Sequence, residues 1–477
     1  MQPQFRIAAP LLILLLALAP IVTRAQDVDA VPAGDSADLQ LTAASERFLR
    51  LMDEGRNADA VAAGVELVNL TRQRYGDGSL ELVSPLTKLA AAQLRNGELR
   101  EAEANYTTAI TLLEKREGFL SPHLTDPLVG LGATYIRGEQ YPQATETYER
   151  ALRVNHVNDG FYNPEQNPIR DGLTEGYLGL RKIEKANFHQ EAQVSAAQRT
   201  LGKDNPQMVA PLTKLGRWYD RSYQAESARL AYQTAARIVE KNGGENSPEL
   251  VEPLLAIAET YRQQALLPPD PESSQAPETL LPTTSMMLRR ALEIVEHQQP
   301  PDPEQRARIL VKLGDLYLMW GKRNTASDRY LEAWQALSAD GLQVRRDEYF
   351  AAPVRIMGPV PPAIFPVPSS KTGAPDPKSL EPGFVVVRFD VDRLGRVMDV
   401  TVVEADPANL LEKRVTDAAR AAVFRPRYVD GAPVATTGLI LRHAFRYAPA
   451  KLERKDEAPP ESSDKRLDQP SSGEPGG

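Results

Sequence analysis

The amino-acid sequence predicts a mainly helical protein, in which an α-solenoid of stacked helix pairs is followed by a small α+β domain of ββαβ order. Three observations predict this fold class. A pattern of apolar, aromatic and small residues recurs every 42 residues, prolines then interrupt it, and the last folded stretch alternates apolar with polar residues. A long fixed period is typical of helical repeats, whereas strict alternation is typical of strands.

The repeat is defined by apolar residues with fixed neighbours. Its leading positions are Leu89, Leu131, Leu173, Leu215 and Ile257, and after a proline-rich insertion around residues 268–282 the next is Leu313. Thirteen residues further on stands a small residue, at Ala102, Ala144, Ala186, Ala228 and, in the last unit, Ala326. Small residues at this spacing are expected where two antiparallel helices cross closely.

Three segments, over residues 128–148, 212–232 and 310–330, carry the pattern L-x2-L-G-x2-Y followed by A-x3-Y. The pattern resembles the tetratricopeptide repeat (TPR), whose signature has Trp at the first position. The 42-residue unit resembles the kinesin-light-chain-like subclass, although the paired Asn of that subclass are replaced, for example by Thr87 and Lys88. The resemblance implies a protein-binding array with an inner groove.

Each unit also has a proline that predicts the start of its first helix, because proline at the first turn loses no hydrogen bond. The pairs are Ser121-Pro122, Asn163-Pro164, Asn205-Pro206 and Ser247-Pro248.

Arginines recur on the predicted first helices and are candidate partner-binding residues of the groove: Arg95, Arg137, Arg217, Arg221 and Arg262. One interpretation is a basic stripe that binds an acidic or C-terminal carboxylate peptide. The other is an ordinary solvated helix face, since Gly179, Gln263 and Met319 interrupt the row. Both interpretations stay open.

Alternating apolar residues after the prolines predict a small antiparallel sheet. The first strand would present Val385, Val387, Phe389 and Val391 on one face, and the returning strand Met398, Val400 and Val402. A helix with one apolar face follows, formed by Leu411, Val415, Ala418, Ala419 and Ala422. The last strand runs over residues 436–447.

This segment resembles the TonB C-terminal domain. The resemblance rests on residues 383–392, 395–403, the Phe-Arg-Pro stretch at 421–426, the Asp-Gly-Ala-Pro-Val stretch at 430–434, and Phe445. It implies a periplasmic domain whose last strand accepts a peptide of an outer-membrane transporter as an added strand. The implied contact residues are Thr437, Leu439, Leu441, His443 and Phe445. The alternative is that the module only caps the array or dimerises.

The first 25 residues have the features of a secretory signal peptide. Arg6 precedes an apolar stretch over residues 11–22, and Thr23 and Ala25 supply the small residues that cleavage requires. We expect the mature chain in the periplasm of a Gram-negative-type envelope. The alternative is an inner-membrane anchor over residues 7–22, which is short because a spanning helix needs about 20 apolar residues.

The predicted organisation has six parts. They are a signal peptide over residues 1–25, a flexible N-terminal segment over 26–42, a TPR-like array over 43–338, a Pro-rich connector over 339–382, the TonB-like domain over 383–447, and a disordered tail over 448–477.

Composition excludes several other classes. A net charge of −8 and the lack of any Lys/Arg-rich run argue against nucleic acid as a partner. The absence of cysteine excludes disulfides and thiol catalysis, and the five histidines are too far apart to form a local metal-ligand pair. We expect neither an enzyme nor a cofactor or metal site.

The expected function is therefore to bind proteins or peptides, such as an outer-membrane transporter or another envelope protein. The alternative is a divergent or accessory TonB-type energy transducer for outer-membrane transport, anchored by residues 7–22. Such transducers have a polar residue in the anchor and a long proline-rich spacer, and this sequence has neither. A third hypothesis is an enzyme subunit whose array recruits substrate.

Overall fold

A computed structural model of the chain describes residues 33–266, 277–339, 341–365 and 377–449. The chain divides into two compact units, residues 1–182 and 183–477. The predicted signal peptide and nearly all of the predicted tail lie outside the described residues. None of the described helices is long and apolar enough to cross a membrane.

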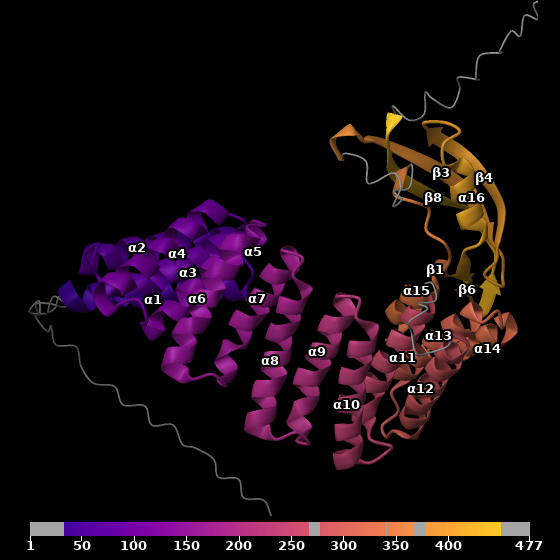
Figure 1. The fold of residues 1–477 in the computed structure, drawn as a ribbon, viewed down its shortest axis with the longest axis horizontal. Coiled ribbons are helices and arrows are strands. Elements are labelled where there is room, and N and C mark those ends of the chain that lie inside the picture. The colour runs from indigo at the N-terminus through magenta and orange to yellow at the C-terminus, as the bar shows by residue number, and fades with distance from the viewer. Residues whose placement is uncertain (1–32, 267–276, 340, 366–376, 450–477) are drawn as a thin grey trace, which may run out of the picture. The chain divides into compact units, whose positions relative to one another are not determined.

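In its described residues, the first unit consists of three antiparallel helix pairs, each of which packs on the next, and a seventh helix that packs on the last pair (Figure 1). Its helices are α1 (Ala33–Asp53), α2 (Asn57–Tyr75), α3 (Val83–Asn96), α4 (Leu99–Glu117), α5 (Thr125–Arg137), α6 (Tyr141–Asp159) and α7 (Asn167–Gly179). Helix α1 starts ten residues before the predicted start of the array. Residues 33–42, which we predicted to be part of a flexible segment, therefore lie in a helix.

The second unit continues the helix pairs and carries the strands. Its helices are α8 (Ile183–Leu201), α9 (Val209–Arg221), α10 (Ala225–Gly243), α11 (Val251–Leu266), α12 (Pro277–His297), α13 (Pro303–Met319), α14 (Arg323–Ala336) and α15 (Gln343–Phe350). The described residues leave a gap at 267–276 between α11 and α12, which pack together as one pair. This is where the sequence predicted an insertion.

A single 3-10 turn precedes the first helix of most units. The turns are η1 (Leu80–Leu82), η2 (Pro122–Leu124), η3 (Pro164–Gln166), η4 (Pro206–Met208) and η5 (Pro248–Leu250). The side chain before the turn caps η1 to η4: for example, Asn163 Oδ1 accepts from the Glu165 amide at 2.9 Å, and Asn205 Oδ1 accepts from the Gln207 amide at 2.9 Å. Ser247 before η5 makes no such hydrogen bond. The Ser/Asn-Pro pairs thus start this turn rather than the α-helix itself.

The repeat residues form the core within each pair. The repeat alanines Ala102, Ala144, Ala186, Ala228 and Ala326 are all fully buried. Gly132 lies so close to Tyr148 of the second helix that an added Cβ would stand 2.7 Å from the ring. Gly216 meets Tyr232, and Gly314 meets Tyr330, in the same way. The signature glycine therefore makes room for the signature aromatic.

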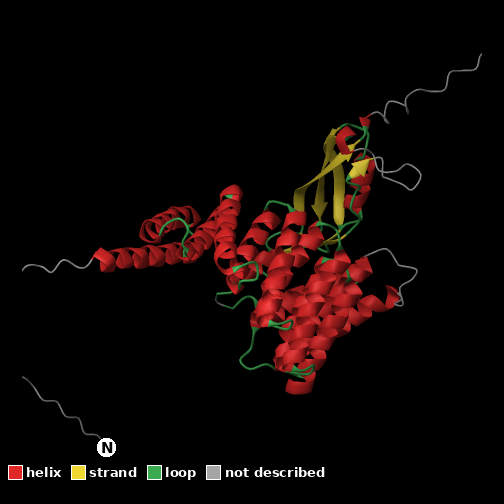
Figure 2. Cartoon of the chain, turned by 60° about the vertical axis from the view of Figure 1, so that its left-hand side comes forward, coloured by secondary structure: helices red, strands yellow, loops and turns green. Residues whose placement is uncertain are grey.

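The C-terminal strands form a small sheet with α16 (Glu412–Arg420) packed against it (Figure 2, strands yellow). The four-stranded sheet has the order β2-β8-β3-β4, from β2 (Ile364–Phe365), β8 (Thr436–Tyr447), β3 (Glu381–Val391) and β4 (Val397–Asp406). Two short ladders accompany it, formed by β1 (Val354–Met357) with β5 (Val423–Arg425) and by β6 (Arg427–Val429) with β7 (Ala432–Val434).

The predicted ββαβ order is confirmed by β3, β4, α16 and β8, and the predicted core by the burial of Val385, Val387 and Val415. Two details differ. The connector was predicted to be extended, but it contains α15, β1, β2 and the turn η6 (Pro377–Ser379). Strand β4 does not alternate cleanly, because its register with β3 shifts twice, so Met398 and Val402 are 47% and 42% exposed.

Candidate functional site

Most of the predicted groove arginines end a helix. Arg95 and Arg137 in the first unit, and Arg221 in the second, lie exposed in the last turns of α3, α5 and α9. A basic side chain there stabilises the helix by about 0.3–1 kcal/mol through the macrodipole. Arg217 is exposed on α9, one turn earlier. These positions are compatible with both interpretations of the arginine row.

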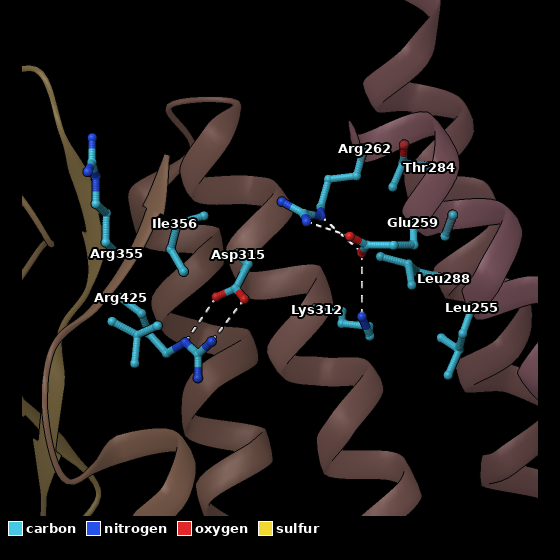
Figure 3. Close-up of a pocket in the computed structure, with 12 residues that line it drawn as sticks. Leu255, Glu259, Arg262, Thr284, Leu288, Lys312, Asp315, Arg355, Ile356 and Arg425 are labelled. Atoms are coloured by element: carbon cyan, nitrogen blue, oxygen red, sulfur yellow. Dashed lines mark hydrogen bonds and ion pairs between the residues drawn. The ribbon is translucent and has the colours of Figure 1, made fainter. Parts of the chain in front are cut away.

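Arg262 is different, because it lines a cavity in the second unit. The cavity has a volume of about 320 Å³ and lies among α11, α12, α13, β1 and β5 (Figure 3). Its apolar wall is formed by Leu255, Ala258, Leu288, Val354 and Ile356, and its charged groups are Glu259, Arg262, Lys312, Asp315, Arg355 and Arg425. It is thus lined by array helices on one side and by the connector and the C-terminal domain on the other.

On one side of the cavity, Glu259 forms ion pairs with Arg262 and Lys312. Arg262 donates to its carboxylate from Nε, at 3.0 Å to Oε2, and from Nη2, and Lys312 Nζ lies 3.6 Å from Oε2. Burial alone would raise the pKa of Glu259, but the hydrogen bond and the charge of Arg262, with Lys312, outweigh it, so the pKa is lowered. The Arg262 guanidinium, in turn, has a raised pKa because it donates to Glu259. Arg262 is therefore already engaged within the chain.

The opposite side is a buried ion pair between the array and the C-terminal domain. Arg425 donates to Asp315 through two parallel hydrogen bonds, Nε to Oδ1 and Nη2 to Oδ2, each of 3.0 Å (Figure 3). The two side chains are only 7% and 18% exposed. Tyr330 donates to the same carboxylate at 2.7 Å, and Arg425 Nη1 donates to the Tyr349 carbonyl at 3.0 Å. Each polar group of the pair therefore has a partner, as burial requires.

An aromatic cluster extends this contact. Tyr428 of β6 packs against Phe350 of α15 with 5.1 Å between ring centroids, and it stacks with Trp334 of α14 at 6.2 Å. The ring of Phe350 also meets Tyr330 edge-on at 6.2 Å. The last helix pair of the array thus holds the β5 and β6 segment of the C-terminal domain.

Sequence reasoning did not find this contact. Arg425 was noticed as part of the Phe-Arg-Pro stretch, but its partner Asp315 precedes it by 110 residues. No local spacing connects two such residues, and only the three-dimensional structure brings them together.

The predicted last-strand residues lie on β8, mostly facing inward. Phe445 is 4% exposed in the domain core, and Leu439 and Leu441 pack against the same core. His443 Nε2 lies 3.0 Å from the Pro362 carbonyl oxygen, whereas Thr437 is exposed. An added strand would therefore contact the backbone of β8 and not most of these side chains.

One end of the outer edge of β8 already carries a strand. Strand β2 pairs with it in parallel, and the amides of Arg446 and Ala448 donate to the carbonyls of Ala363 and Phe365 at 2.8 and 3.1 Å. Because backbone direction alternates along a strand, the N–H and C=O groups of Ile440, Arg442 and Ala444 face the same outer side. No strand in the described part of the chain pairs with them there.

The other edge of the sheet, β4, is less suited to pairing. It has two register shifts against β3, and Asp399 has a φ of 51°. It also carries the acidic side chains of Asp399, Glu404 and Asp406. Bulges and charges are the features by which natural sheets avoid pairing at an edge. The more regular edge for strand addition is therefore β8.

Comparison with solved structures returns helical repeat proteins. A kinesin light chain-type protein of Podosopora anserina with nearly identical TPR-like repeats is 18% identical, with a TM-score of 0.39, and the match covers 45% of this chain and 99% of that one. A TPR repeat-containing protein of Cytophaga hutchinsonii is 13% identical, with a TM-score of 0.40, covering 65% of this chain and 98% of that one. BtubC from P. vanneervenii is 20% identical, with a TM-score of 0.35, covering 56% and 95%. All three TM-scores lie below 0.5, so the fold assignment rests on the helix pairs of this chain itself.

No curated protein sequence matches the chain. Residues 379–447 match the family model of the Gram-negative bacterial TonB protein C-terminal. The predicted resemblance of this segment is thereby confirmed, and the chain is a helical repeat array followed by a TonB C-terminal-like domain.

Proposed function

We propose that the protein is a periplasmic interaction protein, in which the TPR-like array binds one partner and the TonB-like domain pairs with an envelope protein by strand addition. The observation that carries the proposal is the outer edge of β8, which already accepts a short parallel strand at one end and has further backbone groups facing outward. An added strand would satisfy these groups, so its affinity would come from the main chain.

The array contributes further candidate contacts within each unit. The exposed arginines Arg95 and Arg137 of the first unit, and Arg217 and Arg221 of the second, are candidates for contact with an acidic or carboxylate-ended peptide. Arg262 supports this role less, because it is engaged by Glu259. An outer-membrane transporter or another envelope protein remains the proposed class of partner for β8.

The strand-addition proposal predicts that Ala444→Pro removes a partner. Ala444 is exposed, and its amide faces outward, so proline there blocks an incoming strand without removing a bond to β3. The matched control is Ala444→Ser, which keeps the amide. Full-length chains of both variants and the wild type would be used to capture envelope proteins by affinity. A protein captured by wild type and Ala444→Ser but not by Ala444→Pro is expected, and equal capture by all three would contradict strand addition at β8.

A second candidate function is an anchored TonB-type transducer, favoured only by the apolar residues 7–22 and the TonB-like domain. N-terminal sequencing of the mature protein separates the two. A mature chain that begins at Gln26 would eliminate the anchored transducer, whereas an intact N-terminus in the inner-membrane fraction would favour it.

A further inference from the structure

We propose that β2 is an internal placeholder for the partner strand. On this view, which rests on the proposed strand addition, a partner enters parallel to β8, brings a large apolar side chain to the position of Phe365 and displaces β2. The proposal adds to the function above the direction of the partner strand, one side chain that it must supply, and a segment of the chain that competes with it.

The backbone contacts define the direction. Ile364 stands opposite Arg446, and Phe365 stands opposite Tyr447, in parallel register. The two hydrogen bonds from β8 to this segment use the outward-facing amides that an added strand would use. A partner that pairs along the whole edge in this register would therefore need the site that β2 occupies.

The side-chain contacts define the anchor. Phe365 is half-buried and packs against the domain core formed by β3, α16 and β8. The Arg414 guanidinium lies over its ring at 5.8 Å from the centroid. The polar contact of His443 with Pro362 holds the backbone just before β2. The outer edge of β8 therefore has, at its C-terminal end, a site for one large apolar side chain. An aromatic side chain is favoured there, because the Arg414 guanidinium would lie over its ring.

The pairing of β2 is short enough to be displaced. It comprises two residues, whereas β3 pairs with β8 over nearly its whole length. A longer partner would keep the contacts at Arg446 and Ala448 and add others at Ile440, Arg442 and Ala444. Because β2 belongs to the same chain, it competes for the edge of β8 at an effective concentration of roughly millimolar. A partner strand that pairs over only a few residues would therefore be excluded, whereas one that pairs along the whole edge would displace β2.

The test compares the full-length wild type with Phe365→Ala. The matched control is Val360→Ala, because Val360 lies in the same connector but is 79% exposed. Two measurements are made: amide hydrogen exchange along β8, and the affinity for an acetylated peptide of sequence Val-Pro-Pro-Ala-Ile-Phe, which copies residues 360–365. A peptide that ends in Ala instead of Phe serves as the control ligand.

In Phe365→Ala we expect faster exchange at Arg446 and Ala448, with unchanged exchange at Leu441, whose amide faces β3. The peptide should bind this variant about tenfold or more tighter than the wild type or Val360→Ala, and the Ala-ended peptide should bind more weakly. Unchanged exchange at the two amides, or equal peptide affinity for all chains, would overturn the placeholder.

Different results would contradict the placeholder proposal and the proposed function. Equal and measurable peptide binding by wild type and Phe365→Ala would overturn the placeholder and leave strand addition intact. Capture of the envelope partner by Ala444→Pro would overturn strand addition at β8, whatever Phe365→Ala does. Loss of protection at Leu441 would reveal a misfolded domain, and Ile364→Ala would then replace Phe365→Ala in both measurements.

Discussion

At the scale of single residues, the same side chain has different roles in equivalent repeats. Arg95, Arg137 and Arg221 complete helix ends in solvent, where a positive charge offsets the helix dipole. Arg262 is turned into a cavity wall and binds Glu259. The difference comes from the surroundings: of the four helices that carry these arginines, α11 is the one whose described residues line the cavity beside the connector strand β1.

Glu259 provides a prediction about pH. Its pKa is lowered in the folded chain, so the stabilisation from its ion pair is fully present above the pKa of an unfolded glutamate, about 4.3, and is lost as the pH falls through the lower folded-state pKa. Glu259→Gln should therefore lower the free energy of unfolding at pH 7 by about 1.5–3 kcal/mol, and by much less at pH 3. Urea unfolding at the two pH values measures this.

The matched control is Glu252→Gln on the same helix, because Glu252 is 63% exposed and its pair with Arg308 lies at the surface. A surface pair contributes little, so this variant should stay within about 0.5 kcal/mol of wild type. If Glu259→Gln lowers the free energy of unfolding by as much at pH 3 as at pH 7, the charge of Glu259 does not stabilise the fold, and the packing of its side chain does.

At the scale of elements, three helix pairs, α5/α6, α9/α10 and α13/α14, depend on a complementary glycine and tyrosine. The bare backbone at Gly132 lets Tyr148 of the second helix lie directly on the first, and the same arrangement recurs at Gly216 with Tyr232. The 3-10 turns occupy part of the extra length that separates this 42-residue unit from a standard repeat.

Gly132→Ala is expected to destabilise the array. The new Cβ would stand 2.7 Å from the Tyr148 ring, closer than side chains tolerate, so the two helices must separate. Overpacking of this kind costs about 1–3 kcal/mol. The control is Gly138→Ala, since a Cβ there meets its nearest neighbour at an ordinary 3.5 Å and φ is −85°. Thermal unfolding of both variants decides the matter: equal melting temperatures would show that the ring moves aside without cost.

At the scale of the whole molecule, the second unit joins the end of the array to the TonB-like domain through a specific contact. The pair Asp315 and Arg425 is buried, and Tyr428 packs among Trp334 and Phe350. In a buried pair of this kind desolvation offsets most of the attraction, whereas removing one partner leaves the other charge buried and unpaired. The domain is therefore positioned by the array instead of being only tethered to it.

Asp315→Asn should loosen this contact strongly. It leaves the Arg425 guanidinium buried without a counter-charge, which costs about 3–5 kcal/mol. We expect faster amide exchange in β5 and β6, while β3 and β8 stay protected within their own sheet. Asp417→Asn is the control, because its pair with Arg420 is more than half exposed. If exchange in β5 is the same in both variants, the ion pair does not hold the domain.

Much of the fold could be predicted from local pattern. The helix pairs follow from residues such as Leu131, Gly132 and Ala144, whose spacing is read within one unit, and the ββαβ order follows from alternation in β3 and apolar spacing in α16. The irregular β4 could not be predicted, since Met398 and Val402 alternate in sequence but bulges turn them outward. Strand β2 has only two residues, too few for any periodicity.

The sequence by itself determined a helical array, its repeat length and a TonB-like last domain, because these depend on contacts between residues close in the chain. Only the tertiary structure decided where the array meets that domain, which arginine lines a cavity, and that the connector adds a strand to β8. Each of these depends on residues tens to more than a hundred positions apart. Such contacts depend on which apolar groups are buried and which charges are paired in the folded chain. They produce no periodic pattern in the sequence from which they could be predicted.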